Sequence, residues 1–265
     1  MLCCNRIDNY SIAYLNLIIK KNINIFFLVS FRNLNYLRKG YIMIKIKKQC
    51  DRAGCKDVFK AFLVKNANYE GELEIPVIKG IKNIPNKVIS FIDAMKNSTK
   101  DFNQWVHFYI DDFHFIKIWN RPKDFVERLK KFNGVILPDF SVYRDMPLVM
   151  QYYNIYRSRA IGNFLQSNGI KVIVNIRYGD ERTYECACFG APHKSIIAIG
   201  TNGTVKNVID RNYLDDGFDY IVNELEPKII VVYGSVTKHI KEVCDIKNIR
   251  IISFHSEQYE RYRGN

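Results

Sequence analysis

The chain has 265 residues, of which 48% are hydrophobic and 25% are charged, the proportions of an ordinary globular protein. Its net charge of +13 is typical of nucleic-acid binders. Residues 1–50, however, hold nine Lys or Arg and one Asp, a net charge of +8, so the remainder carries only +5. The main part is therefore only mildly basic, which weakens the case for a dedicated nucleic-acid binder. No linker or fixed repeat divides the chain.

Residues 1–42 differ in character from the rest. The apolar stretch "LNLIIKKNINIFFLVSF" is interrupted by Lys20 and Lys21, whereas a membrane-spanning helix needs roughly 20 apolar residues. It also lacks the charged start and cleavage site of a signal peptide. We interpret 1–42 as an extension translated from an early start, with a membrane-surface helix or a loosely packed tail as alternatives. Residues 43–265 are predicted to form one α/β domain.

Seven cysteines occur in a chain without a secretion signal, which predicts a cytoplasmic, reducing setting. Neither Cys50 and Cys55 nor Cys186 and Cys188 have the spacing of a zinc knuckle. Scattered buried or free thiols are therefore expected.

Short β-rich runs recur along the chain. Segments 73–78 and 88–91 supply two candidate strands. Six further runs follow in order: Val106–Ile110, Val135–Leu137, Lys171–Ile176, Ile196–Ile199, Ile229–Tyr233 and Arg250–Phe254. These runs are apolar throughout, as strands covered on both faces are.

Helical patterns separate most of these runs, over residues 122–132, 147–168, 208–225 and 236–247. The second is predicted to end at Asn168–Gly169 and the last to begin after Ser235, a good N-cap. The apolar stripe of the second is Val149, Tyr153, Tyr156, Ala160 and Phe164. That of the third is Leu214, Phe218, Ile221, Val222 and Leu225, and that of the last is Ile240, Val243 and Cys244. The segment after Ile176 has room for only one or two helical turns.

Alternating strands and helices predict an α/β fold with a parallel sheet. With segments 73–78 and 88–91 the strands would reach the eight of a closed (β/α)8 barrel. The alternative is an open doubly wound sheet. The barrel-like arrangement is favoured slightly.

Ligands bind at the carboxyl ends of parallel strands in both folds, and polar residues follow nearly every predicted strand. In chain order they are Asp111 and Asp112; Asp139, Ser141, Tyr143, Arg144 and Asp145; Arg177, Asp180, Glu181 and Arg182; Thr201, Asn202 and Thr204; Gly234 and Ser235; and His255, Ser256 and Glu257. Carboxylates gathered on one rim would bind a divalent cation, pair with arginines, or have one pKa raised. The simpler interpretation is that these strand ends are merely solvated.

The leading hypothesis is an enzyme acting on a phosphate-bearing or nucleotide-like substrate, with Mg²⁺ as a candidate cofactor. Its candidate catalytic carboxylates are Asp112, Asp139, Asp145 and Asp180, the first two also being candidate metal ligands. Its candidate binding groups are Ser141, Tyr143, Arg144, Arg177, Arg182, Thr201, Asn202 and Ser235. The alternative is a non-catalytic accessory that binds nucleic acid or another protein.

Three further features have two interpretations each. The turns at 200–203 and 233–235 are either anion sites or ordinary βα turns. Arg157 and Arg159, near several tyrosines, either bind phosphate and stack on bases or are solvated beside core tyrosines. His107, inside a predicted strand, is either a ligand or, the interpretation we favour, a hydrogen-bonded core histidine.

Five stretches carry a family resemblance: "WVHFYIDDFHFIKIWN", "GVILPDFSVYRDMPLVMQYYNIYRSRAIG", "GIKVIVNIRYGDERTYE", "IAIGTNGT" and "IIVVYGS". In this order they resemble a bacterial and phage family known as domain of unknown function 4417, over residues 55 to about 257. Val174 departs from an expected proline, and "CACFGAP" replaces an expected acidic-glycine turn, which puts a role for that loop in doubt. The resemblance implies no reaction. It implies a cytoplasmic protein carried by phages, prophages or other mobile elements.

Overall fold

A computed structural model of the protein describes residues 56–202 and 208–255. The predicted extension 1–42 lies outside these residues, as do Thr204, Ser256 and Glu257, so the division into 1–42 and 43–265 stays a prediction. Within the described residues, no helix is both long and apolar enough to cross a membrane.

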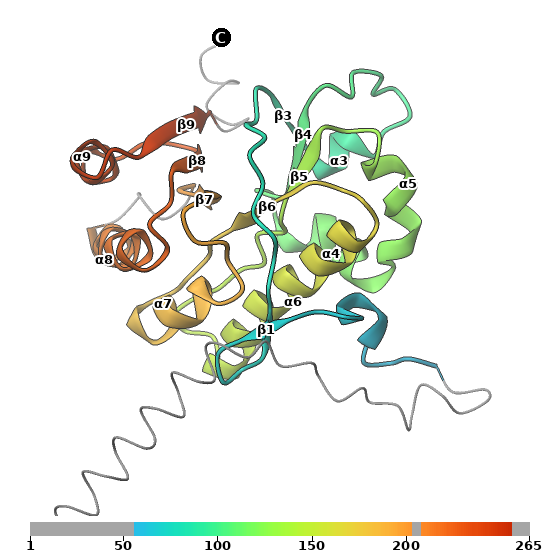
Figure 1. Ribbon diagram of the computed structural model, residues 1–265, viewed down its shortest axis with the longest axis horizontal. Coiled ribbons are helices and arrows are strands. Elements are labelled where there is room, and N and C mark those ends of the chain that lie inside the picture. The colour runs from blue at the N-terminus through green and yellow to red at the C-terminus, as the bar shows by residue number, and fades with distance from the viewer. Residues whose placement is uncertain (1–55, 203–207, 256–265) are drawn as a thin grey trace, which may run out of the picture. The chain divides into compact units, whose positions relative to one another are not determined.

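A parallel sheet organises the described part of the chain (Figure 1). Its seven strands are β3 (Val88–Ser90), β4 (Trp105–His107), β5 (Gly134–Ile136), β6 (Val172–Asn175), β7 (Ile196–Gly200), β8 (Ile229–Tyr233) and β9 (Arg250–Phe254). They lie side by side in sequence order, and every neighbouring pair is parallel.

This strand order decides between the two predicted architectures. A doubly wound sheet reverses its strand order at a switch point, whereas here each strand pairs with the next one in sequence. The sheet curls into a half-barrel with helices along its outer side, as Figure 1 shows. The prediction of a parallel, barrel-like α/β fold is confirmed.

Helices connect the strands. They are α3 (Phe91–Ala94), α4 (Asp112–Asn120), α5 (Val126–Leu129), α6 (Leu148–Ser167), α7 (Glu181–Cys188), α8 (Val208–Leu225) and α9 (Lys238–Ile246), with 3-10 turns at Ala61–Val64 and Pro122–Phe125. The predicted ends of α6 and α8 are confirmed, as is the short helix α7. The cap of α9 is corrected: Thr237, rather than Ser235, accepts the Ile240 N–H.

Of the two early candidate strands, only 88–91 joins the sheet, as β3. The other gives β2 (Ile75–Pro76), which pairs antiparallel with β1 (Tyr69–Glu70) in a separate two-stranded ribbon. Pro76 has no N–H to offer a second neighbour, which favours an edge position. The expected closed eight-stranded barrel is therefore wrong for the described residues, in which the sheet is an open half-barrel.

The two faces of the sheet differ because successive side chains point to opposite sides. The outer face carries the large core under the helices, including Val106, Val135 and Val172. The inner face carries a smaller apolar cluster that includes Trp105 and Ile173. Towards the carboxyl ends of the strands, the same alternation places polar residues on the inner face.

His107 is one of these inner residues, and it is 2% exposed. Its Nδ1 accepts the Tyr109 N–H, and its ring packs 4.4 Å from that of Tyr233. Burial lowers the pKa of His107 to about 3, so the ring is neutral at physiological pH. The interpretation as a core histidine is confirmed.

The cysteines of the described residues, Cys186, Cys188 and Cys244, are buried and free. Burial raises the pKa of Cys186 and Cys188 to about 12, so these thiols stay protonated and unreactive. The expectation of buried free thiols is confirmed here, and Cys50 and Cys55 lie outside the described residues.

Candidate functional site

The loop between β5 and α6 is held in place by polar side chains of α6. Gln151 donates to the Met146 carbonyl, Asn154 to the Ser141 carbonyl, and Ser158 to the Pro138 carbonyl. All three side chains are buried. They replace the water that the loop's backbone would otherwise bind, so the loop is fixed to the helix along its length.

This arrangement corrects the predicted buried face of α6. Val149 and Tyr153, which belong to the predicted apolar stripe, are 72% and 45% exposed. The helix turns its polar stripe inward over its first half because the loop carbonyls need donors. Apolar periodicity alone therefore predicted the wrong buried face for the first half of α6. The apolar stripe predicted for α8, by contrast, is buried throughout.

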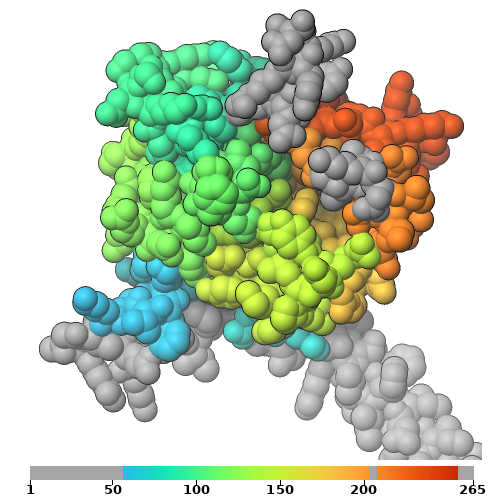
Figure 2. Space-filling model, turned by 180° about the vertical axis from the view of Figure 1, so that it is seen from behind, coloured from blue at the N-terminus to red at the C-terminus, as the bar shows by residue number. Residues whose placement is uncertain are grey.

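A pocket of about 360 Å³ opens at the carboxyl ends of β5, β6 and β7. Figure 2 shows this face, with the yellow-green loop after β5 and the orange α8 on either side of a hollow. The lining residues are Asp111, Val142, Tyr143, Arg144, Ile176, Arg177, Tyr178, Gly179, Ile199, Gly200, Asn202, Asp210, Tyr213 and Leu214. The volume lies within the range of small-molecule sites.

Four of the predicted site residues line this pocket: Tyr143, Arg144, Arg177 and Asn202. Strand-end reasoning found them because each lies in a loop that follows a strand of the sheet. The first turns of α8 also contribute Asp210 and Tyr213, which that reasoning missed. These two residues could have been predicted, because a helix that follows a parallel strand begins at the same carboxyl-end rim of the sheet.

Arg177 is the cation at the inner part of the pocket. Its side chain is half-buried, and its Nε is buried without a hydrogen-bond partner. Among the described residues it has no hydrogen bond or ion pair, although the Asp139 carboxylate is near enough for the two charges to interact. A buried N–H group is normally hydrogen-bonded, so the buried Nε of Arg177 is a donor still able to bind an anion.

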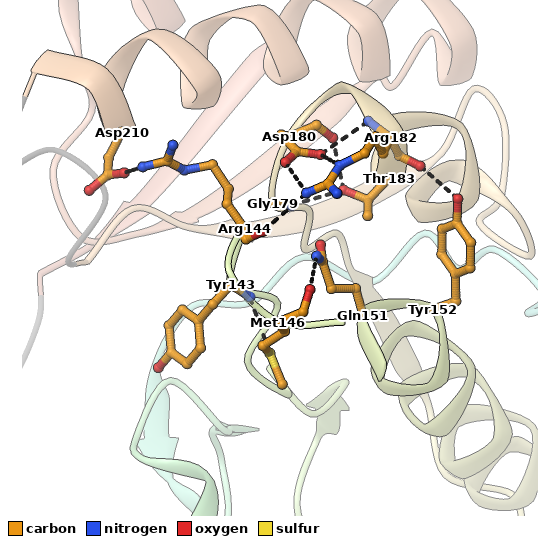
Figure 3. A network of polar contacts seen from close by, with 10 residues as sticks. All are labelled: Tyr143, Arg144, Met146, Gln151, Tyr152, Gly179, Asp180, Arg182, Thr183 and Asp210. Atoms are coloured by element: carbon orange, nitrogen blue, oxygen red, sulfur yellow. Dashed lines mark hydrogen bonds and ion pairs between the residues drawn. The ribbon is translucent and has the colours of Figure 1, made fainter. Parts of the chain in front are cut away.

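Arg144 lies at the outer side of the pocket and is already paired (Figure 3). One of its guanidinium nitrogens, Nη2, lies 2.6 Å from Oδ1 of Asp210, and its guanidinium stacks 4.6 Å from the centre of the Tyr213 ring. The Asp210 hydrogen bond raises the pKa of Arg144. This pair joins the loop after β5 to α8 across the pocket.

Asp139 belongs to a chain of hydrogen bonds that crosses three strand ends. Asn175 donates from Nδ2 to Oδ1 of Asp139 at 2.8 Å, and Tyr109 donates its hydroxyl to Oδ1 of Asn175 at 2.9 Å. Burial raises the pKa of Asp139, partly offset by Arg177 and Asn175. Asn175 and Tyr109 were not predicted as site residues, although a polar side chain within an apolar strand was a usable signal.

Asp112 and Ser141 form a second local contact. Ser141 donates its backbone N–H and its hydroxyl to the Asp112 carboxylate, the hydroxyl at 2.8 Å. The hydroxyls of Ser141 and Tyr143 lie 3.1 Å apart. Asp112 thus holds the loop after β5 against the start of α4.

Asp180 and Arg182 pair with each other (Figure 3). The carboxylate accepts from Nε and Nη2 of Arg182 and from its backbone N–H, so it also caps α7. Arg182 in turn donates to the Arg144 carbonyl. Neither side chain lines the pocket. Instead, Asp180 orients Arg182, and Arg182 holds the loop that carries Arg144 in place.

Asp180→Ala is expected to lower the free energy of unfolding by about 1–2 kcal/mol, because it removes both the cap and the half-exposed ion pair. Asp180→Asn keeps the cap and should recover about half of that loss. The Arg182 hydrogen bond lowers the pKa of Asp180, so this stabilisation is present above the unfolded pKa and is lost as pH falls through the folded value. Urea unfolding at pH 7 and pH 3 measures it, and equal losses in the two variants would contradict the capping role.

The remaining predicted residues lie around the pocket. Asp145 is exposed and forms no hydrogen bond or ion pair with other described residues. Thr201 is buried and donates to the Ser235 carbonyl, which ties the turn after β7 to the turn after β8. The Ser235 side chain is exposed.

Arg157 and Arg159 are both less exposed than predicted. The Arg157 guanidinium is half-buried and lies 4.0 Å from the centre of the Phe140 ring. Arg159 is 1% exposed and donates to the carbonyls of Asn175, Ala187 and Phe189. The interpretation of solvated arginines is wrong, because backbone carbonyls replace the solvent around Arg159.

In the described part of the chain, no group of three or more His, Cys, Asp or Glu side chains could hold a metal ion. Asp112 and Asp139 interact electrostatically, but each is already bound by a neighbouring donor. A metal ligand role for this pair stays a prediction.

Comparison with known proteins places the sequence in a family. The sequence pattern of the family called domain of unknown function (DUF4417) matches residues 67–255. The chain belongs to the DUF4417 family. The matched range contains every strand of the sheet and every residue of the pocket, so the predicted resemblance is confirmed.

Two phage proteins are similar to this DUF4417 chain. It is 27% identical over 158 residues to the Gene 1 protein of Mycobacterium phage D29, covering 60% of this chain and 57% of that protein. It is 30% identical over 145 residues to the Gene 1 protein of Mycobacterium phage L5, covering 55% of this chain and 62% of that protein. The chain thus spans less than two thirds of either relative. No solved structure matches it.

Proposed function

We propose that this DUF4417 protein is an enzyme that binds a phosphate-bearing small molecule in the pocket at the carboxyl ends of β5–β7. Arg177 is the principal anion contact and Arg144 the second. Asp139, beside Arg177, is the proposed catalytic carboxyl, and Asp112 supports the loop that carries Tyr143 and Arg144. The free thiols support a cytoplasmic setting, and the phage relatives support one linked to mobile elements.

The observation that carries this proposal is the buried Nε of Arg177, which has no hydrogen-bond partner among the described residues. Removing charge from water without a partner is costly, and Arg177 has no hydrogen bond or ion pair among the described residues. A planar guanidinium binds phosphate oxygens through paired N–H donors. A bound phosphate would supply the missing acceptors.

The rest of the lining suits an organic phosphate better than a bare ion. Tyr143 is 55% exposed and lines the pocket with Tyr213 and Asn202. Aromatic faces stack on planar groups, and an amide can donate and accept hydrogen bonds. Asp111 and Asp210 would accept from hydroxyl or amino groups of such a ligand, which supports a nucleotide-like substrate.

Calorimetric titration with inorganic phosphate and with adenosine 5′-monophosphate tests the proposal. Arg177→Met is expected to weaken binding of both by about 10- to 100-fold, the loss of about 1.5–3 kcal/mol from charged hydrogen bonds. Arg250→Met is the matched control, because Arg250 is exposed at the amino end of β9, the opposite end of the strands. It removes the same charge and should leave both affinities unchanged.

Two results would contradict the proposal. If neither compound binds the wild-type protein, the pocket is not a phosphate site. If Arg177→Met and Arg250→Met weaken binding equally, only overall charge matters. The alternative of a nucleic-acid-binding accessory predicts that second result with an oligonucleotide, together with a steep loss of affinity as salt rises.

A further inference from the structure

The charged side chains that line the pocket are two cations, Arg144 and Arg177, and two carboxylates, Asp111 and Asp210. Asp139 lies behind this lining, near enough to Arg177 for the two charges to interact. The described lining therefore has no excess of positive charge. Sites for nucleoside di- and triphosphates, by contrast, surround the phosphate chain with several cationic groups or metal ions.

Arg144 is held on the α8 wall of the pocket by two contacts. Its Nη2 lies 2.6 Å from Oδ1 of Asp210, and its guanidinium lies 4.6 Å from the centre of the Tyr213 ring. Asp210 and Tyr213 are three residues apart on α8, so they lie on one face of the helix. Figure 3 shows the Arg144 side chain extended towards Asp210. A ligand anion therefore meets an Arg144 whose charge is already balanced.

The backbone from which Arg144 extends is also fixed (Figure 3). Nη2 of Arg182 donates to the Arg144 carbonyl at 3.0 Å, and Nε2 of Gln151 donates to the Met146 carbonyl at 2.9 Å. Moving this part of the loop would break both hydrogen bonds. The Arg144 side chain must therefore leave Asp210 before its charge can serve another anion.

Arg177 differs from Arg144 in this respect. Its buried Nε has no hydrogen-bond partner among the described residues, so a phosphate can accept from it without displacing a protein group. The pocket thus offers one available cation and a second one that a carboxylate already holds. Asp210 would also repel a second phosphate that approaches Arg144, and such a repulsive contact is a common source of specificity.

Resting on the proposed phosphate site, we propose that the substrate carries a single phosphate and that Asp210 is the residue that selects it. The phosphate binds Arg177, and Arg144 contributes only the N–H donors that Asp210 leaves. A second phosphate would have to displace the Asp210 carboxylate from Arg144 and lie beside it. The class of ligand that the pocket selects is therefore a nucleoside monophosphate rather than a di- or triphosphate.

Calorimetric titration with adenosine 5′-monophosphate and adenosine 5′-diphosphate tests this inference, with EDTA present so that no divalent cation neutralises the second phosphate. The ratio of the two affinities cancels the contacts that both ligands make. The wild-type protein is expected to bind the diphosphate no more than about threefold more tightly than the monophosphate. Asp210→Asn should raise the ratio in favour of the diphosphate by about tenfold, because Arg144 then binds the second phosphate through charged hydrogen bonds.

Two further variants show whether the effect passes through the Arg144–Asp210 pair. Asp216→Asn is the matched control, because it removes the same charge from an exposed position of α8. It should leave the ratio unchanged. Adding Arg144→Met to Asp210→Asn should return the ratio to its wild-type value, because the released cation is then missing. Binding of inorganic phosphate by each variant shows that the Arg177 site is intact.

Four results would overturn the inference and leave the phosphate site standing. They are a wild-type preference for the diphosphate above the expected range, an unchanged ratio in Asp210→Asn, an equal rise in Asp216→Asn, and a ratio that stays raised in the double variant. If neither nucleotide nor inorganic phosphate binds the wild-type protein, the phosphate site and the inference fail together.

Discussion

Arg159→Met is expected to lower the free energy of unfolding by about 3–5 kcal/mol, the cost typical of breaking a buried charged network. Arg159 is the buried cation of α6, and burial lowers its pKa to about 10, so it is charged at physiological pH. Its donors reach the carbonyls of Ala187 and Phe189 at the carboxyl end of α7 and that of Asn175 in β6. Methionine fills similar space but leaves these three carbonyls without their donors.

The placement of these carbonyls explains why a lone guanidinium is tolerated here. The carboxyl end of a helix carries partial negative charge, and two of the three acceptors lie there. Arg159 therefore joins α6, α7 and β6 at one point. It also holds the backbone of Asn175, whose side chain orients Asp139.

Urea unfolding of Arg159→Met and Arg250→Met measures the effect. Arg250 is exposed, so its replacement should change stability by no more than about 0.5 kcal/mol. A loss below about 1 kcal/mol in Arg159→Met would show that its carbonyl partners find other donors.

Gly190→Ala is expected to destabilise the protein by about 2–5 kcal/mol, the second large effect. Gly190 has a φ of +70°, and a Cβ there would lie 2.2 Å from the backbone oxygen of Pro76. Left-handed backbone costs a residue with a side chain about 1–2 kcal/mol, and overpacking adds about 1–3 kcal/mol. The clash cannot be relieved by a rotamer because its partner is backbone.

The glycine is needed where the β1–β2 ribbon joins the main body. Its N–H donates to the Glu70 carboxylate at 2.6 Å, and its carbonyl accepts the Ile78 N–H at 2.9 Å. A methyl group would separate these partners. The expected result is therefore release of the ribbon as well as loss of stability.

Gly169→Ala is the matched control for this prediction. Gly169 follows α6 with a φ of +80°, and a Cβ there would meet nothing within 4 Å. It should show the cost of left-handed backbone alone, about 1–2 kcal/mol. Thermal unfolding of both variants separates the two costs, and equal losses would argue against the close contact with Pro76. Hydrogen exchange at Ile78 reports whether the ribbon is released.

Several elements follow from the sequence with little error. The bounds of β8, β9 and α8 agree with their predicted runs. β8 is apolar throughout and largely buried, and α8 has a regular apolar stripe. Gly169 ended α6 as predicted, since its backbone is left-handed there. Predicting Arg177 required only its place after β6. These are local signals, and each can be read within about twenty residues.

The site depended on contacts that no local signal contains. Tyr109 and Asn175, like Arg144 and Asp210, are 66 residues apart and come from strand ends two positions apart in the sheet. They meet because the strands lie in sequence order. The buried polar side chains of α6 likewise donate hydrogen bonds to the carbonyls of the loop after β5. The sequence does not specify the path of that loop. Asp180 illustrates the converse, because its nearest cation is two residues away.

The sequence by itself determined the repeating strands and helices and the rim at which polar residues gather. The physical reason is that side chains buried in a strand or a helix recur at the period of that element. The tertiary structure alone decided that the strands lie in sequence order, that the sheet stops short of a closed barrel, and which charges are satisfied. Arg177 and Arg182 have the same chemistry and lie five positions apart. Arg182 finds Asp180 two residues away, a local pairing, whereas only the folded arrangement leaves Arg177 without a hydrogen bond or ion pair among the described residues.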